Sequence, residues 1–386
     1  MMAGPLEGVR VLEIAGIGPA PFAAMMLADA GAEVLRIDRL GTETWWGVDR
    51  EVLRRDLVNR GRRSVAVDLK EPAGAEMVLK LASSAHGLIE GFRPGVAERL
   101  GLGPERCFER NPGLVYGRMT GWGQEGPYAR VAGHDINYIA LSGALDLIGR
   151  AGDAPVPPVN LVGDFGGGAM FLAFGMVCGF LEQRRSGLGQ VVDAAMVDGS
   201  AVLTTFIRGM KEMGLWQGER GQNLIDTGAP FYEVYETADG SYVAVGAIEP
   251  EFYAELVRLA GVSTEELPLQ MDAAHWPAMK QRFAAIFATR TRDEWCRLLD
   301  GTDACVTPVL SMQEATEHPH NVERSTFIEV DGVSQPAPAP RFSRTPGAVQ
   351  MPPPVPGEGG LRALEDWGIG SDEIAMLAES GVIEAR

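Results

Sequence analysis

Apolar residues at the start of the chain follow the periods of a buried strand, a helix and a second strand. Residues 9–14 alternate and are rich in β-branched side chains, as a buried strand requires. Two glycines and two prolines in 15–21 interrupt this strand, and the compact apolar run 22–30 predicts a helix. Residues 33–38 then form the next strand pattern. This order predicts a parallel α/β sheet at the start of the chain.

The turn after the first strand nearly reproduces a dinucleotide-binding fingerprint. Gly16 and Gly18 occupy two of its glycine positions, and Asp38 supplies an acid about twenty residues later. The third glycine position holds Pro21, however, and Arg39 directly follows the acid. Because an arginine there suits a phosphorylated ribose, the pattern favours a nucleotide with an extra phosphate, such as coenzyme A, over plain NAD.

Strand and helix patterns continue to alternate beyond this point. An apolar helix is expected over 169–184, a strand over 191–194 and a linker helix over 198–213. Near the end of the chain, the Pro- and Gly-rich segment 334–360 predicts an extended connection, and Ser371 is the expected N-cap of a last helix.

The segment between these parts has a different pattern of predicted strands and helices. Strand patterns over 231–237 and 241–248 flank Ala238-Asp239-Gly240, a hairpin signal, and Pro250 suits the first turn of the next helix. Thr291-Arg292-Asp293-Glu294 predicts a capping box at the start of another helix.

These patterns together predict an α/β protein of two domains. A large, discontinuous, Rossmann-like domain is expected over 1–200 and 325–386, with the linker helix after residue 200. A smaller α+β domain is expected over 230–315. A chain of 386 residues is long enough to bury a core in each.

Two motifs carry candidate chemistry. Gly133-His134-Asp135 places one of five histidines in a polar turn led by glycine, and Gly163-Asp164-Phe165 opens a glycine-rich loop that leads into the apolar helix. An imidazole and a carboxylate on separate elements can act on two faces of one carbon. The alternative is a hydrogen-bonded turn without a catalytic role.

Charge and cysteine content narrow the class of partner. The formal net charge of −18 argues against nucleic acid. Residues 1–100 nevertheless hold 13 Lys/Arg against 14 Asp/Glu, so this part of the chain is nearly neutral and can bind a polyanionic ligand.

The four cysteines lack CxxC or metal-ligand spacing, so free thiols, no metal and a reducing compartment are expected. The chain's start lacks a basic segment followed by an apolar one, and the apolar stretches are interrupted early; a cytoplasmic protein without a membrane partner is therefore expected.

Longer motifs resemble those of the class III CoA-transferase (CaiB/BaiF) family over essentially the whole chain. The resemblance lies in Pro5-Leu6-Glu7-Gly8-Val9, Ala32-Glu33-Val34-Leu35-Arg36-Ile37-Asp38-Arg39, Gly121-Trp122-Gly123-Gln124-Glu125-Gly126-Pro127 and Val191-Val192-Asp193-Ala194-Ala195-Met196. Three further motifs resemble the members of this family that act as racemases: Gly133-His134-Asp135-Ile136-Asn137-Tyr138, Asn160-Leu161-Val162-Gly163-Asp164-Phe165 and Val245-Gly246-Ala247-Ile248-Glu249-Pro250.

The resemblance implies an acyl-CoA substrate, no separate cofactor and an interlocked homodimer. It also implies the residues that contact CoA, namely Arg39, Val67, Lys70, Gly91, Phe92, Arg93, Arg99, Gly133, Asp135 and Tyr138. The family's basic motif is interrupted here as Asn59-Arg60-Gly61-Arg62-Arg63, so the roles of these arginines stay open.

The racemase pattern further implies inversion of the α-carbon of 2-methylacyl-CoA thioesters, within fatty acid metabolism. His134 and Asp164 would each serve one face of that carbon, and Glu249 would orient and charge His134. Partial burial is expected to raise the pKa of Asp164, and the start of the helix after it would stabilise the enolate.

The alternative within the family is a CoA-transferase that forms an acyl anhydride on Asp164. Transferases of this family need no histidine at position 134 and typically carry a glutamine a few residues later. The chain has His134 and no glutamine in that motif, which favours the racemase.

Overall fold

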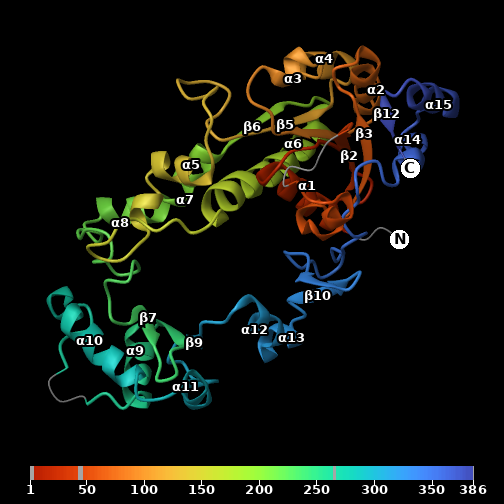
Figure 1. The fold of residues 1–386 in the computed structure, drawn as a ribbon. Coiled ribbons are helices and arrows are strands. Elements are labelled where there is room, and N and C mark those ends of the chain that lie inside the picture. Colours follow the sequence, from red (N-terminus) through yellow and green to blue (C-terminus); the bar gives the residue numbers. More distant parts are fainter. Residues whose placement is uncertain (1–3, 42–46, 264–266, 386) are drawn as a thin grey trace. The chain divides into compact units, whose positions relative to one another are not determined.

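The computed structural model describes residues 4–41, 47–263 and 267–385 (Figure 1). Contacts between residues divide the chain into two compact units. Unit 1 consists of Met1–Ser142, Val159–Leu203 and Pro319–Arg386, and unit 2 consists of Gly143–Pro158 and Thr204–His318. The first three residues, which open the segment expected to lack a secretory signal, lie outside the described residues.

Unit 1 is built on a mostly parallel sheet with the strand order β12-β3-β2-β1-β4-β5-β6. Its strands are β1 (Arg10–Ile14), β2 (Glu33–Arg39), β3 (Arg62–Val67), β4 (Gly87–Glu90), β5 (Val115–Thr120), β6 (Val191–Ala195) and the short β12 (Ile383–Glu384). All neighbours pair in parallel except β12, which runs antiparallel to β3. The order 3-2-1-4-5-6 is that of a doubly wound Rossmann sheet, so the predicted fold class is confirmed.

Helices cover both faces of this sheet. One face packs against α2 (Pro72–Ala82), α4 (Pro104–Arg110), α14 (Gly360–Asp366) and α15 (Ser371–Glu379). The other face packs against α1 (Pro19–Asp29) and α6 (Met170–Ser186). Figure 1 shows the last two helices, in blue, beside β12 and β3 at the edge of the sheet. The end of the chain therefore completes a core that the first hundred residues begin.

The first helix begins earlier than its apolar pattern indicated. It starts at Pro19 rather than at residue 22, because a proline at the first helical position has the required φ and loses no hydrogen bond. Gly18, the residue before it, has φ 70° and ψ −116°, a conformation that only glycine adopts without strain.

The segment that follows Asn160 is helical, which corrects the expected glycine-rich loop. Leu161–Ala169 form a π-helix, η4, that continues directly into α6. Its glycines allow close packing against α5 (Asp135–Ser142) and α7 (Met196–Leu203): a Cβ at Gly163 would collide with Asp135, and one at Gly167 would meet Ser200. The helix therefore starts before Asp164 rather than after it.

Residues 161–186 form a helix that is long and apolar enough, by length and composition alone, to cross a membrane. The expected interruption by glycines is absent because glycine is tolerated inside a helix. Leu172, Met176 and Phe180 on this helix are buried in the core of unit 1 against the sheet.

The expected single helix over 198–213 is two helices. α7 ends at Leu203, and α8 (Thr205–Glu212) begins after Thr204, which lies at ψ −1°. The break coincides with the boundary between the two units.

Unit 2 contains a three-stranded antiparallel sheet, β7 (Tyr232–Glu236), β8 (Tyr242–Gly246) and β9 (Val306–Pro308). The predicted hairpin is confirmed as β7 and β8. Around the sheet lie α9 (Pro250–Leu259), α10 (Trp276–Phe287) and α11 (Arg292–Leu299), and α12 (Met312–Glu317) follows β9 in the chain. The expected capping box is present at Thr291, and Pro250 is the first residue of α9. Buried aromatic rings, including Phe231, Phe283 and Trp295, form its core.

The connection after residue 325 contains more structure than its composition indicated. β10 (Phe327–Val330) and β11 (Val333–Pro336) pair as an antiparallel hairpin before the extended part begins. Gly370, not Ser371, is the N-cap of α15, and Ser371 is its first helical residue. The remaining short elements are η1 (Arg50–Arg55), η2 (Leu57–Asn59), α3 (Val96–Arg99), η3 (Leu145–Leu147), η5 (Ala273–His275) and α13 (Pro319–Glu323).

Candidate active site

The strand order of unit 1 reverses between β1 and β4, and ligands of doubly wound sheets bind beyond the carboxyl ends of the strands at that point. The first turn of α1 and the residues after β4 meet there, since a Cβ on Gly91 would lie 3.4 Å from the Cβ of Ala20. Asp164 reaches the same place from η4: a Cβ on Gly18 would lie 3.3 Å from its Oδ2.

Asp164 is held by hydrogen bonds at both its backbone and its side chain. Its N–H donates to Oδ1 of Asp135 over 2.6 Å, and Nδ2 of Asn160 donates to its Oδ2 over 3.2 Å. The neighbouring Phe165 packs on Phe22 of α1, with ring centroids 4.7 Å apart. The rings of Phe22 and Phe165 thus form an aromatic wall beside Asp164, whose position the hydrogen bonds fix.

Burial raises the pKa of Asp164 above its ordinary value of 3.8. The hydrogen bond from Asn160 and the nearby His134 act in the opposite direction, whereas the negative charge of Asp135 adds to the rise. A carboxyl group in this environment can both accept and donate a proton at a pH closer to neutrality than a solvated aspartate can.

His134 lies just before α5, and its side chain is exposed. Its N–H donates to Oδ1 of Asn137 over 3.0 Å, which fixes the turn ahead of the helix. The imidazole is close enough to Asp164 to lower the pKa of that carboxyl. The structure therefore brings together the two predicted acid/base residues, which are thirty positions apart in the sequence.

Three of the residues expected to contact CoA surround this pair. Asp135 is buried, and its second oxygen, Oδ2, has no hydrogen-bond partner in the described residues. Tyr138 donates its hydroxyl to the carbonyl of Gly133 and packs edge-on against Trp122. Burial raises the pKa of the Tyr138 hydroxyl to about 12, with Asp164 adding to the rise and Arg93 opposing it. The charge of Arg93 therefore reaches this site.

A cavity of about 520 Å³ in unit 1 brings two other predicted contacts together. Lys70 and Arg99 both line it, with Arg106 as a third cation and Glu76 as an acidic residue. Its apolar walls include Leu69, Leu79 and Leu100. Cations around an apolar pocket suit a ligand that combines phosphates with a flat ring.

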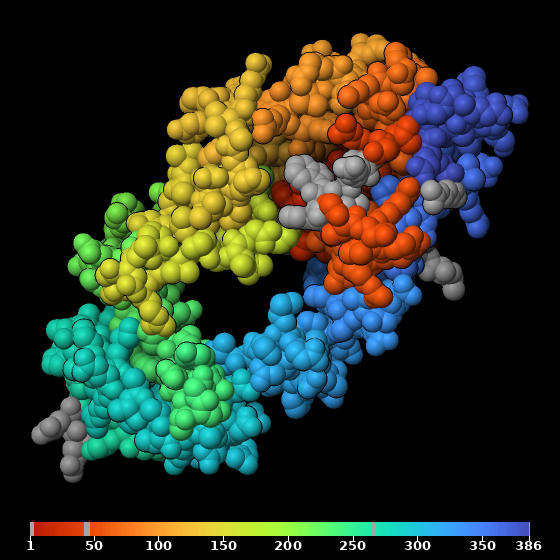
Figure 2. Space-filling model, viewed as in Figure 1, coloured from red at the N-terminus to blue at the C-terminus, as the bar shows by residue number. Residues whose placement is uncertain are grey.

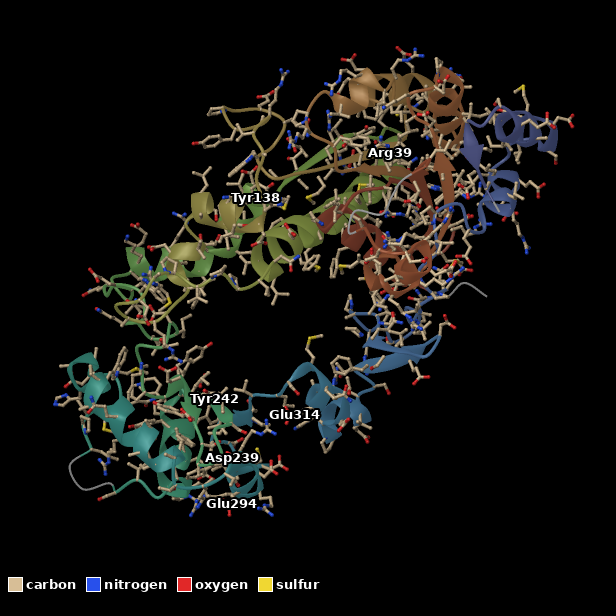
Figure 3. All side chains as sticks on the ribbon, viewed as in Figure 1. Arg39, Tyr138, Asp239, Tyr242, Glu294 and Glu314 are labelled. Carbon is tan, nitrogen blue, oxygen red and sulfur yellow. The ribbon has the colours of Figure 1, made fainter. Side chains whose placement is uncertain are left out.

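Arg39 lies exposed at the end of β2, and Figure 3 labels it together with Tyr138 on α5. Val67, by contrast, is fully buried at the end of β3, so its side chain faces the core rather than a ligand.

The arginines of the interrupted basic motif serve the interior of unit 1. Arg60 pairs with Asp29 over 2.6 Å, and Arg62 pairs with Glu13 over 2.6 Å, with all four side chains buried. Arg63 pairs with Glu33 and Asp366 and so ties β3 to α14.

Glu249, the third predicted catalytic residue, belongs to unit 2. It is exposed, and it is the N-cap of α9 without a side-chain capping bond. Its charge acts on Cys305, where burial and then Glu249 raise the pKa of the thiol.

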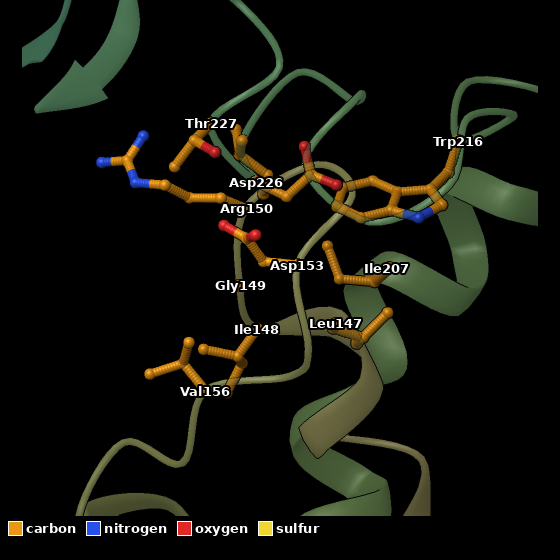
Figure 4. A pocket seen from close by; sticks show the side chains of 11 residues that line it. Leu147, Ile148, Gly149, Arg150, Asp153, Val156, Ile207, Trp216, Asp226 and Thr227 are labelled. Atoms are coloured by element: carbon orange, nitrogen blue, oxygen red, sulfur yellow. The ribbon is translucent and has the colours of Figure 1, made fainter.

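Unit 2 has its own cavity of about 540 Å³, shown in Figure 4. Leu147, Ile148, Val156, Ile207, Trp216 and Ile225 form apolar walls, and Arg150, Asp153, Asp226 and Thr227 add polar groups. None of the residues predicted from the sequence lines it.

Two residues at the first site were not predicted from the sequence as individual contributors. Asn160 contacts the carboxylate of Asp164. It is the first residue of the motif that contains Asp164, and no other feature of the sequence pointed to its role. Phe22 supplies the aromatic wall, and no pattern distinguished it from a core residue. Among the residues that the structure describes, no three His, Cys, Asp or Glu side chains are grouped as a metal ion would require.

Comparisons with known proteins agree with the motifs. The sequence matches CoA-transferase family III over residues 6–359. It is 49% identical over 384 residues to the alpha-methylacyl-CoA racemase of Mus musculus, covering 98% of each chain. It is 46% identical over 384 residues to the protein of the same name from Homo sapiens, covering 99% of this chain and 98% of the relative.

Among solved structures, a CAIB/BAIF family protein from Brucella suis superposes with a TM-score of 0.80. The likeness covers 95% of this chain and all of that one, and at 23% identity it bears on the fold alone. The family match extends over most of the chain, and the relatives match at nearly full length. The chain belongs to CoA-transferase family III.

Proposed function

We propose that the protein epimerises (2R)- and (2S)-2-methylacyl-CoA thioesters by transfer of the α-proton through an enolate. The observation that carries this proposal is the 2.6 Å hydrogen bond from the N–H of Asp164 to Asp135, which brings η4 to the residue next to His134, with the pKa of Asp164 raised by burial. Inversion requires one acid/base group on each face of the α-carbon. The names of the mouse and human relatives support the same reaction.

Each of the two groups has a distinct part in this reaction. Asp164 removes the proton of the (R)-epimer, and His134 removes that of the (S)-epimer; the other group returns a proton to the opposite face. Glu249 orients His134 and stabilises its charged form. The thioester carbonyl makes the α-hydrogen acidic enough for this transfer, so the CoA ester needs no additional cofactor.

CoA is recognised by the cations of unit 1. The pocket with Lys70 and Arg99 offers charge for phosphates and apolar walls for the adenine ring. The charge of Arg93 lowers the pKa of the Tyr138 hydroxyl, which supports a role for this cation near the acid/base pair. The acidic remainder of the chain makes this local positive charge a condition for binding a polyanion.

A second candidate function is transfer of CoA between carboxylic acids, with Asp164 as the nucleophile that forms an acyl anhydride. The observation that favours it is that Asp164 is only partly buried, in a family that includes transferases. A succinyl-CoA–D-citramalate CoA-transferase of Chloroflexus aurantiacus is 30% identical to this chain. His134 argues against it, because the transfer reaction has no use for a base on a second face.

The active form is proposed to be a homodimer in the cytoplasm, with a role in fatty acid metabolism. The support for the dimer is an apolar surface on η4, α6 and α7, which consists of Leu161, Met170, Phe174, Leu181, Val202 and Leu203, each 45–70% exposed. Figure 2 shows the yellow-green atoms of this region at the surface. Patches of this kind on soluble proteins mark sites of association.

The deciding experiment is proton NMR of a single 2-methylacyl-CoA epimer with the enzyme in deuterated water. A racemase exchanges the α-hydrogen for deuterium and produces the other epimer with no acceptor acid and with chelator present. Appearance of a new CoA ester only after a carboxylic acid is added would favour the transferase instead.

A further inference from the structure

A buried carboxylate stands directly before the segment that is proposed to bind CoA. Glu90 is the last residue of β4 and is 1% exposed. Its Oε2 accepts a hydrogen bond of 2.6 Å from the N–H of Phe92. Its Oε1 accepts one of 3.0 Å from Nε of Arg118. Each oxygen of the Glu90 carboxylate therefore accepts a hydrogen bond, one from the segment that follows and one from the neighbouring strand of the sheet.

Arg118 connects this carboxylate to the other end of the same segment. It lies on β5 opposite Glu90, and its second nitrogen pairs with Glu98 on α3 over 2.9 Å. The residues from Gly91 to Arg99, which include Arg93 and Arg99, are thus fastened at both ends to one buried guanidinium. No sequence motif marks either Glu90 or Arg118 for this role.

We propose that Glu90 and Arg118 are positioning residues that hold segment 91–99 in its CoA-binding conformation, and that this hold is released when Glu90 takes up a proton. The inference rests on the proposed CoA site. Neither residue touches the reacting atoms, so the effect is on the affinity for CoA rather than on proton transfer.

The surroundings of Glu90 make this release accessible near neutral pH. Burial raises its pKa to about 7; the N–H of Phe92 and Arg118 lower it, and the charge of Glu98 raises it. The charge of Glu90 also acts on Tyr116 on β5. Asp193 on β6 lies opposite Arg118, and it interacts with the same guanidinium as Glu90 does. Because the ionised carboxylate makes the stronger hydrogen bonds, the segment is held firmly above about pH 7 and loosely below it.

The first test is the substitution Glu90→Gln, which keeps the side-chain shape and removes the charge. The dissociation constant of CoA is measured by titration calorimetry from pH 6 to 8. Wild type is expected to lose affinity as the pH falls, and E90Q to bind about tenfold more weakly at pH 8 with little further change below. With the substrate ester, the defect appears in KM and not in kcat. Because the 3′-phosphate of CoA itself titrates near pH 6, the series is repeated with 3′-dephospho-CoA.

The second test uses Glu98→Gln, a substitution at a half-exposed position that does not threaten the core. Removing the charge of Glu98 lowers the pKa of Glu90, so the loss of affinity is expected at a lower pH than in wild type. Glu105→Gln on α4 makes the same change of charge at an exposed position and should leave the midpoint in place.

Two results overturn the inference while leaving the proposed function intact: CoA affinity of E90Q that matches wild type at every pH, or an E98Q midpoint that does not move. Failure of wild type to bind CoA at any pH overturns both.

Discussion

At the scale of single residues, the site depends on how the protein changes the chemistry of an ordinary aspartate. A solvated Asp164 would be fully ionised at neutral pH and could accept a proton but rarely donate one. Burial beside Phe165 and the adjacent Asp135 raise the pKa of its carboxyl, while Asn160 limits the rise.

Separate substitutions of the two acid/base residues should divide the reaction into halves. Each variant, His134→Ala and Asp164→Ala, should lose epimerisation by on the order of 10²–10⁴. Asp164→Ala should still exchange the α-hydrogen of the (S)-epimer with retention, and His134→Ala that of the (R)-epimer. The measurement is NMR of each pure epimer in deuterated water. Equal loss of exchange for both epimers in both folded variants would contradict the assignment of one residue to each face.

Arg39 tests the recognition of the extra phosphate. Arg39→Ala should weaken binding of the CoA ester about ten- to a hundredfold, as expected for loss of a charge-assisted contact. The defect should be smaller with the 3′-dephospho ester, measured by competition or calorimetry. The same loss for both ligands would show that Arg39 does not contact that phosphate.

At the scale of elements, η4 determines where Asp164 points. Its glycines let the wide helical turn pack directly on α5 and α7, and Asp135 of α5 then holds the N–H of Asp164. A loop at this position would leave the carboxylate without a fixed direction.

Gly163→Ala tests this packing. The new Cβ collides with the carboxylate of Asp135, so the substitution should cost about 1–3 kcal/mol of stability and lower the rate of epimerisation at least tenfold. Gly209→Ala in α8 is the matched control, because nothing lies within 4 Å of its Cβ and the same change should stabilise that helix by about 0.5–1 kcal/mol. Denaturant unfolding and activity are the readouts; wild-type values of both for Gly163→Ala would refute this role of the close packing.

At the scale of the whole molecule, unit 1 exposes the apolar surface formed by η4, α6 and α7. Phe174 is 70% exposed there, and Phe174→Glu should convert a dimer into a monomer in size-exclusion chromatography with light scattering. Met376→Glu on α15 introduces the same charge at a residue that is 60% exposed and outside this surface, so it should leave the mass unchanged. A dimeric Phe174→Glu would exclude this surface as the interface.

The sequence by itself determined the features that depend on interactions between residues close together in the chain. Period and turn chemistry predicted the strands around the first turn, the hairpin before Glu249 and the capping box at Thr291, because each depends on neighbours within a few residues. Motifs identified His134 and Asp164 as the candidate pair.

Only the tertiary structure decided the features that depend on distant neighbours. The π-helical geometry of η4 follows from packing against α5 and α7, and no period in 161–169 indicates it. Glu90 is an ordinary strand-end glutamate in the sequence and becomes a titratable support only through burial beside Arg118. The adjacency of His134 and Asp164 likewise arises when two helices pack together, since segments far apart in the sequence meet only after the chain has folded.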